Sequence, residues 1–249
     1  MRSKKIKVSI ILPNYNSSDF IAKTIQSVIR QSFKNWELLI VDDCSNEKTK
    51  EILRKYEKIK RIKVYWLKKN RGTAFCRNFA LKKIKSDFVA FIDSDDLWKK
   101  NKLKKQINFM IKNNYNFTYT YYKTFGQKTS LIRSPEKLNF LEFIKNTSIA
   151  TSSMMLRRKI VKGIKFTNTL ICEDYYFKCS ALQKIKTAHC LKSFETLYRL
   201  RKNSMQSNYF KNLYWIWKIN KNYNNFNFLK NFNSILNISL SSFKRYGFK

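Results

Sequence analysis

The chain has 249 residues, of which 43% are hydrophobic, so a disordered protein is excluded and one large domain, with or without a C-terminal appendage, is expected. Its 52 Lys and Arg against 16 Asp and Glu give a formal net charge of +36, which favours an anionic partner such as nucleic acid, an anionic membrane or a phosphorylated small molecule. An AT-rich genome would also enrich Lys, so the charge alone does not identify that partner.

Cysteine usage and apolar runs indicate the cellular setting. The five Cys form no C-x-x-C pair, and with a single histidine, His189, the sequence argues against a zinc site. We interpret His189 as structural. The apolar run before Pro13 is too short for a signal peptide, and no run approaches the roughly 18 apolar residues of a transmembrane helix. Reduced thiols in a cytoplasmic protein are expected.

Short apolar, β-branched runs alternate with helical patterns through the first 114 residues. Such alternation predicts a mostly parallel sheet with helices on both faces, because continuous apolar strands are covered on both sides. Ser18 is the expected cap of the first helix. The strands are predicted at 7–13, 36–43, 62–67 and 87–93, and the helices at 19–31, 47–59, 74–85 and through Leu103, Ile107, Met110 and Ile111.

The alternation fades after residue 114. Strands are predicted at 116–125 and 148–156, and one or two more within 187–200. Residues 171–185 open with two acids and read as a helix. The chain from residue 205 onward is aromatic, basic and Asn-rich, which predicts a helical extension with its boundary near residue 204.

Two acid clusters follow predicted strands, which is unexpected in so basic a chain. Asp42 and Asp43 end the second strand, and Asp93, Asp95 and Asp96 follow the fourth. The carboxyl ends of parallel strands share one edge, where ligands bind in open α/β sheets. Adjacent carboxylates repel one another, and Mg²⁺ or Mn²⁺ relieves that repulsion while bridging to phosphates. Helix capping is the alternative, but it explains one of the three acids after strand four.

The order and spacing of four segments resemble glycosyltransferase family 2, the inverting enzymes of GT-A fold. The segments are VSIILPNYNSSDFIAKTIQSVIRQSFKNWELLIVDDCS, NRGTAFCRN, FIDSDD and CED, and the resemblance covers about residues 6–205. It implies an α/β, Rossmann-like GT-A catalytic domain over residues 1–204. Within it, residues 1–114 would be the nucleotide-binding half and 115–204 the acceptor half, followed by a basic aromatic helical extension at 205–249.

The resemblance also implies roles for residues of the donor site, which would hold a nucleoside-diphosphate sugar. Asp42 would contact the base, with a turn or cap role as the alternative; Arg77 would offer its planar fork to the diphosphate, with a solvated helix arginine as the alternative. Asp93 would meet the ribose, and Asp95 and Asp96 would hold Mn²⁺ or Mg²⁺. The remaining residues of the implied donor site are Pro13, Tyr15, Asn70 and Gly72.

Two further positions match the family pattern near the acceptor half. Asp174 of the Glu173–Asp174 pair would be the general base that takes the proton of the acceptor hydroxyl, although acids also suit a helix N-terminus. Relatives often carry Y-R-x-H where this chain has YRLR, so Arg201 stands in the place of that His. An arginine cannot ligate a cation, but it can neutralise a phosphate directly.

The predicted function is transfer of a sugar from a nucleoside-diphosphate sugar, with UDP-sugar expected, to an acceptor hydroxyl with inversion. Resemblance to bacterial relatives implies polysaccharide, lipooligosaccharide or capsule biosynthesis, with a glycan or lipid-linked glycan acceptor. Trp215 and Trp217 among Lys in the extension suit an anionic membrane surface, hence a peripheral location on the cytoplasmic face of the inner membrane; packing on the domain or dimer formation is the alternative. A basic nucleic-acid-binding protein is the rival function, but acids occupy the rim where a polyanion would sit, so no nucleic-acid partner is expected.

Overall fold

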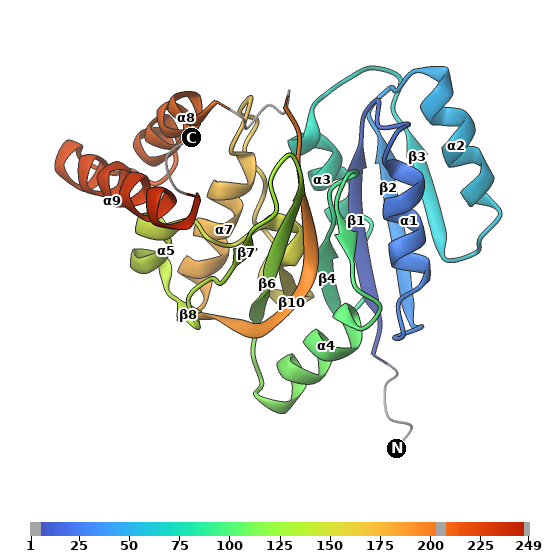
Figure 1. The fold of residues 1–249 in the computed structure, drawn as a ribbon, viewed down its shortest axis with the longest axis horizontal. Helices are drawn as coiled ribbons and strands as arrows, with labels where there is room; N and C mark the ends of the chain where they lie inside the picture. The colour runs from blue at the N-terminus through green and yellow to red at the C-terminus, as the bar shows by residue number, and fades with distance from the viewer. Residues whose placement is uncertain (1–5, 203–207, 247–249) are drawn as a thin grey trace.

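A computed structural model describes residues 6–202 and 208–246 (Figure 1). Helices cover both faces of a central twisted sheet, and two long helices lie at one side, next to α5. The strands are β1 (Val8–Asn14), β2 (Trp36–Asp42), β3 (Ile62–Trp66), β4 (Phe88–Phe91), β5 (Leu97–Trp98), β6 (Phe117–Gly126), β7 (Leu131–Ile132), β8 (Lys137–Leu138), β9 (Met155–Arg157) and β10 (Ala188–Leu200). The helices are α1 (Ile21–Ile29), α2 (Glu47–Glu57), α3 (Thr73–Leu81), α4 (Lys102–Lys112), α5 (Phe140–Asn146), the 3₁₀ turn η1 (Thr151–Ser153), α6 (Arg158–Val161), α7 (Glu173–Lys184), α8 (Tyr209–Asn222) and α9 (Phe228–Tyr246).

The strands of these residues form one mixed sheet in the order β3-β2-β1-β4-β9-β6-β10-β5, with β7 paired to β6 and β8 to β10. β1 pairs in parallel with both β2 and β4, and β6 pairs in parallel with β10. The antiparallel strand β9 joins β4 to β6, so the six longer strands all point the same way. The prediction of a mostly parallel sheet with helices on both faces is confirmed.

The core divides between the two faces of the sheet, as the side-chain alternation of buried strands requires. Along β1, Ile10 and Leu12 pack with α1 and α4, while Ile11 packs on the other face with α3 and α7. Every residue of β1 and β2 is buried. The four predicted strands of the first half lie within two residues of their expected ends.

Two local predictions are wrong. Ser18 does not cap the first helix, because α1 begins at Ile21 with Phe20 at the N-cap position and no side-chain cap. The strand expected at 148–156 is replaced by the turn η1 followed by the short strand β9. Ser153 explains that difference, because its backbone N–H and its hydroxyl both donate to the carbonyl of Ala150, at 3.0 and 2.7 Å. Hydroxyl side chains compete with ladder hydrogen bonds in this way.

A buried polar network anchors the C-terminal helices to the sheet domain. The Tyr175 hydroxyl of α7 donates to Asn220 of α8 at 2.9 Å, and Asn220 donates to Asn231 and Ser234 of α9, both at 3.1 Å. Ser234 in turn donates to the carbonyl of Ile144 in α5 at 2.6 Å. Because buried polar groups tolerate few alternative arrangements, this network fixes the register of α8 and α9.

Among the described helices none combines the length and apolar character needed to cross a bilayer. The boundary predicted near residue 204 falls among residues 203–207, which lie outside the described residues. Within the described part, β10 ends at Leu200 and α8 begins at Tyr209.

Candidate active site

The carboxyl ends of β1, β2 and β4 meet at one edge of the sheet, and both predicted acid clusters lie there. Asp42 ends β2 and faces Asn14 at the end of β1, while Asp93 follows β4. Parallel pairing of neighbouring strands produces this convergence, as the sequence predicted. We call this edge the acid rim.

Asp42 is fully buried and its carboxylate is held by the fold. It accepts hydrogen bonds from Asn14 Nδ2 at 2.6 Å, Ser45 Oγ at 2.6 Å and the Ser45 backbone at 2.9 Å. Such contacts shape the loop after β2 and hold the carboxylate in one orientation. The neighbouring Asp43 accepts from the backbone N–H groups of Arg71 and Gly72, both at 2.7 Å. Asp43 thereby fixes the loop that carries Asn70 and Gly72.

The remaining donor-loop residues lie around this point with different exposures. Pro13 is buried within β1, where it pairs with Val41, while Tyr15 just beyond it is half exposed. Asn70 is exposed, and Gly72 precedes α3 with a φ of 84°, a conformation that favours glycine. Tyr15 and Asn70 are therefore accessible to a ligand at the rim.

Arg77 of α3 is buried beneath the rim and links Asp93, which follows β4, to Glu173 in the first turn of α7. Its Nη2 donates to Asp93 at 2.6 Å and its Nη1 donates to Glu173 at 2.5 Å, with 3% of the residue exposed. The guanidinium also lies 5.1 Å from the ring centroid of Phe166. Because both terminal nitrogens are bound to carboxylates, the fork predicted to meet a diphosphate is already occupied.

The acids after β4 contact two arginines at the end of β10. Arg201 Nε forms an ion pair with Asp95 Oδ2 at 2.7 Å. The Arg199 backbone donates to Asp96 Oδ1 at 2.8 Å, and Arg199 Nε donates to the carbonyl of Asp95 at 2.9 Å. Arg201 therefore reaches the cluster as the Y-R-x-H comparison suggested, whereas Arg199 was not singled out from the sequence. The period-two spacing of Arg199, in β10, and Arg201, directly after β10, is the signal that could have indicated Arg199.

Electrostatics in this cluster disfavour negative charge. Burial raises the pKa of Asp95 despite the nearby Arg201, and the charge of Asp93 raises it further. Burial, followed by repulsion from Asp95 and Asp93, raises the pKa of Asp96 well above its usual range. Asp96 Oδ2 is buried and has no hydrogen bond to any described residue. A buried polar atom without a partner is costly, so this oxygen suits a proton or a cation.

Asp174 lies in the first turn of α7 and is held differently. Lys178, one helical turn later, donates to its Oδ2 at 2.5 Å, and the Thr151 hydroxyl donates to the same oxygen. Burial alone would raise the pKa of Asp174, but the charges of Lys178 and then Arg77 outweigh it and lower the pKa to about 2. Asp174 is therefore ionised at neutral pH. The i, i+4 spacing from Asp174 could have indicated Lys178, whereas nothing local indicated Thr151.

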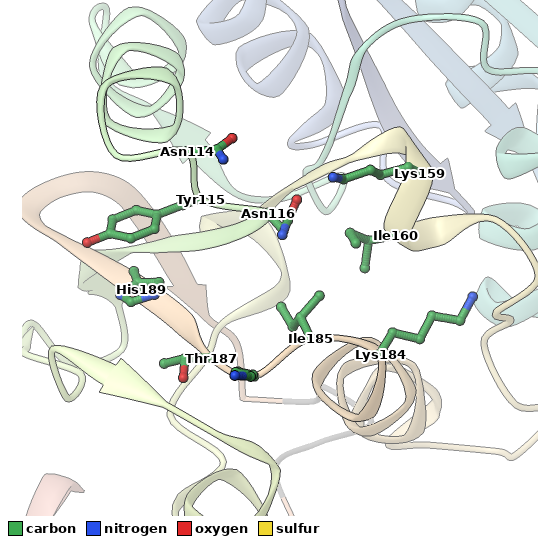
Figure 2. A pocket seen from close by; sticks show the side chains of 10 residues that line it. Asn114, Tyr115, Asn116, Lys159, Ile160, Lys184, Ile185, Thr187 and His189 are labelled. Atoms are coloured by element: carbon green, nitrogen blue, oxygen red, sulfur yellow. The ribbon is translucent and has the colours of Figure 1, made fainter.

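A hollow of about 740 Å³ lies at the opposite edge of the sheet (Figure 2). It opens at the amino ends of β6 and β10, where Tyr115 stacks on His189 with ring centroids 3.6 Å apart. Burial, then the charge of Lys137, lowers the pKa of His189. A neutral, stacked imidazole supports a structural role. Because the acid rim lies at the carboxyl ends of the strands, this hollow is not the predicted site.

Solved structures share this fold. The structure of Staphylococcus aureus TarS 1–349 in complex with UDP-GlcNAc superposes on this protein with a TM-score of 0.76 and 24% sequence identity. The match covers 96% of this chain and 73% of the TarS chain. The mannosyltransferase PcManGT from Pyrobaculum calidifontis, in complex with GDP-Man and Mn²⁺, covers 97% of this chain and 76% of its own, with a TM-score of 0.69 and 13% identity. The architecture is that of the GT-A glycosyltransferases.

Sequence comparison places the chain within that class. Residues 9–165 match the sequence model of the family described as "Glycosyl transferase family 2". TuaG of Bacillus subtilis, whose name assigns it provisionally to teichuronic acid biosynthesis as a glycosyltransferase, is 38% identical over 92% of this chain and 93% of its own. The Escherichia coli UDP-Glc:alpha-D-GlcNAc-diphosphoundecaprenol beta-1,3-glucosyltransferase WfgD is 36% identical over 85% and 84%. The chain belongs to glycosyl transferase family 2 and is a glycosyltransferase, as predicted.

Proposed function

We propose that this glycosyltransferase moves a sugar from a UDP-sugar to a hydroxyl of a glycan or lipid-linked glycan, with inversion, in bacterial surface-polysaccharide assembly. The observation that carries the proposal is the division of acids at the rim. One cluster, Asp93, Asp95 and Asp96, lies beside arginines, and a separate ionised carboxylate, Asp174, lies across the buried Arg77. The names of WfgD and TuaG support the donor and the pathway class.

The donor would bind over the loops after β1, β2 and β4. Exposed Tyr15 and Asn70 offer an aromatic face and an amide to the nucleotide, while buried Pro13 and Asp42 shape the floor beneath them. Gly72 at the start of α3 lets the backbone approach a phosphate, because no Cβ projects there. Asp93 lies between these loops and Arg77, where it could accept from a ribose hydroxyl.

The two rim arginines would then have different roles. Arg201 is about half exposed, pairs with Asp95 and lies 5.4 Å from the ring centroid of Phe20, so its exposed guanidinium can turn to the diphosphate when the donor arrives. Arg77 is buried between Asp93 and Glu173, so we assign it a positioning role rather than the predicted phosphate contact. It would hold Asp93, in the acid cluster after β4, at a fixed position relative to the first turn of α7.

The carboxylates suit the divalent cation, Mn²⁺ or Mg²⁺, that the family resemblance implies. Among the described residues no cluster of three His, Cys, Asp or Glu groups is arranged to hold a metal. Asp95 and Asp96 nevertheless provide oxygen donors, and the unpartnered Asp96 Oδ2 fits a cation whose remaining ligands come from the donor phosphates. A cation bound there would neutralise charge on the departing diphosphate. The structurally similar PcManGT, which was solved in complex with GDP-Man and Mn²⁺, supports this.

Asp174 is the proposed general base. The acceptor oxygen forms its bond to the anomeric carbon as the bond to the diphosphate breaks on the opposite face, which inverts the configuration. The hydroxyl proton passes to the Asp174 carboxylate. A carboxylate with a pKa of about 2 is a weak base, but the hydroxyl becomes strongly acidic as the new bond forms, so transfer late in the step suffices.

Relatives named for lipid-linked or envelope glycans support a matching location for this chain. WfgD is named for an undecaprenol-linked acceptor. We propose that the chain meets its acceptor at the cytoplasmic face of the inner membrane, as a peripheral protein. The catalytic domain would comprise residues 1–204, with donor contacts in 1–114 and acceptor contacts in 115–204, and residues 205–249 would form the extension.

A donor screen tests this function. UDP-, GDP- and dTDP-sugars are mixed with the full chain, with and without Mn²⁺, and the melting temperature is measured. We expect UDP-sugars with Mn²⁺ to raise it most, because a ligand that binds only the folded state stabilises it. Product formation with a lipid-linked GlcNAc-diphosphate acceptor then tests transfer. No stabilisation by any sugar nucleotide, together with salt-dependent DNA binding, would favour the nucleic-acid alternative instead.

A further inference from the structure

Helix α9 exposes large apolar side chains along one side. Leu229 is 76% exposed, Phe228 69% and Leu236 48%, and the other large apolar residues on this side of α9 are also exposed. With roughly 100° per residue, these side chains lie within an arc of about 120°. We call this surface the α9 apolar face; its residues are Phe228, Leu229, Phe232, Leu236, Leu240 and Phe243.

The other side of α9 already has a packing partner. Asn231, Ser234 and Ile238 are buried, and Ser234 donates to the carbonyl of Ile144 in α5. Figure 1 shows α9 at the periphery with α5 alongside it. The α9 apolar face therefore is not the surface by which the helix joins the domain. A large exposed apolar patch of this kind marks an interaction site.

The apolar surface continues onto α8 through aromatic contacts. Phe228 stacks on Phe232 with ring centroids 6.3 Å apart, and it meets Trp217 edge-on at 5.6 Å. Tyr214 and Phe210 of α8 are also more than half exposed. Tryptophan and tyrosine have an apolar ring and a polar group, which suits the boundary between lipid and water.

Basic residues border this surface. Lys230 and Lys244 are exposed on α9, and Lys211 and Lys221 are exposed on α8. The sequence from residue 205 to 249 contains no Asp or Glu at all. On the helix, Lys244 lies about 40° beyond one edge of the apolar arc, so its cation would flank an apolar surface laid against a bilayer. Lys230 lies further round the helix, with its Nζ 4.2 Å from the ring centroid of Phe226.

We propose that the α9 apolar face docks on an anionic lipid bilayer, inserting its Phe and Leu side chains while the bordering lysines meet lipid phosphates. This names the surface for the membrane association proposed above. A second copy of the chain is the competing occupant. A symmetric dimer through this face would bring together two copies of a helix that carries Lys230, Lys244 and Arg245 but no acid, and that repulsion favours a negatively charged partner.

The test is co-sedimentation of the full chain with vesicles. Vesicles of phosphatidylglycerol and phosphatidylcholine are compared with phosphatidylcholine alone, at low and high salt. We expect binding to the anionic vesicles, weaker at high salt because the lysine contribution is screened. Failure of the full chain to sediment with anionic vesicles at low salt overturns the proposal.

Leu236→Asp tests the face itself, with Asn227→Asp as the matched control. Each adds one negative charge, but Asn227 lies before α9 and its Oδ1 accepts from the Lys230 backbone, a contact that Asp keeps. We expect Leu236→Asp to lower the vesicle partition coefficient at least about tenfold and Asn227→Asp to change it less than about twofold. Equal loss in both variants contradicts docking through this face.

Two measurements keep the result interpretable. Circular dichroism checks that Leu236→Asp folds, and Leu229→Asp, at a more exposed position, replaces it if it does not. Sedimentation velocity without vesicles tests the second-copy alternative: a wild-type dimer that Leu236→Asp converts to monomer overturns the membrane assignment. Because the vesicle assay uses neither donor nor acceptor, its failure leaves the transferase proposal standing, and an inactive enzyme leaves the docking proposal standing.

Discussion

The acids that follow β4, proposed for the donor side, and Asp174, proposed for the acceptor side, have opposite electrostatic environments. Asp95 and Asp96 are crowded together, Asp96 is buried and Asp95 partly so, and their pKa values are raised. Asp174 has a cation within 2.5 Å and a pKa lowered to about 2. The first cluster is strained by its own negative charge and gains from a proton, an arginine or a metal ion. The second keeps its charge at every pH at which enzymes normally work.

That contrast matches the two tasks of a displacement reaction. Departure of a diphosphate is easier when a positive charge neutralises the leaving group. Carboxylates that repel one another attract the cation that can supply this charge. Attack by a hydroxyl needs a carboxylate that stays deprotonated. The buried Arg77 touches both sides, through Asp93 and Glu173, and so couples them mechanically.

The largest effect is expected from Asp174→Asn, which removes the acceptor-side charge alone. Transfer should fall about 10³-fold, within the range for loss of a general base. Donor affinity, measured by calorimetry, should change little, because Asp174 contacts Lys178 and Thr151 rather than the donor cluster. A matching loss of donor affinity would show that the two sides are not separate.

Arg77→Gln should break the coupling between the sides. Removing one partner from a buried ion pair costs about 3–5 kcal/mol, because Asp93 and Glu173 would be left close together without their cation. Urea denaturation measures this loss. Arg77→Lys is the control: it keeps the charge but cannot bridge both carboxylates, so it should recover part of the stability. A stable, fully active Arg77→Gln protein would refute the positioning role.

Asp95→Ala should affect the donor side alone. We expect donor affinity in the presence of Mn²⁺ to fall about tenfold to a hundredfold, roughly 1.4–2.8 kcal/mol, since one carboxylate ligand is lost. Chelation of the metal from wild-type protein should have a similar effect, and it should add little in the variant. Calorimetry with and without metal gives both values; metal-independent donor binding in the wild type would contradict the cation proposal.

Lys178→Met should produce the smallest change, visible mainly in the pH profile. Without Lys178 the pKa of Asp174 rises, since burial then acts with less opposition. The acid limb of kcat/KM should therefore move upward in pH, whereas Asp174 contributes no limb above about pH 4 in the wild type. An unchanged profile would exclude Asp174 as the titrating base.

The same pKa shift has a stability consequence. The folded-state pKa of Asp174 is lower than its unfolded value of about 3.9, so the unfolded state binds more protons between these values. Its contribution to stability is present above pH 4 and is lost as the pH falls toward 2. Lys178→Met should flatten that part of an acid denaturation curve.

Sequence patterns predicted the parts of this molecule that are local. Continuous apolar runs located β1, β2, β3 and β4, and the acids at their ends followed from parallel pairing. What no local pattern contained was long-range pairing. Glu173 reaches Arg77 across 96 positions of sequence, and the Arg199 backbone reaches Asp96 across 103. The first contact joins α7 to α3, and the second depends on β10 lying next to β6 and β5, an arrangement that only the completed sheet defines.

The hydrogen-bonded Asn220 network has a consequence for how far from a membrane the enzyme can reach its acceptor. It connects α9 to Tyr175, which directly follows the acid pair that opens α7. If the α9 apolar face rests on a bilayer, Asp174, the proposed general base, is held at a set height above the lipid headgroups. The enzyme would then select acceptors by the distance of their terminal sugar from the membrane. Acceptors in which a longer spacer moves that sugar away from the membrane should react more slowly.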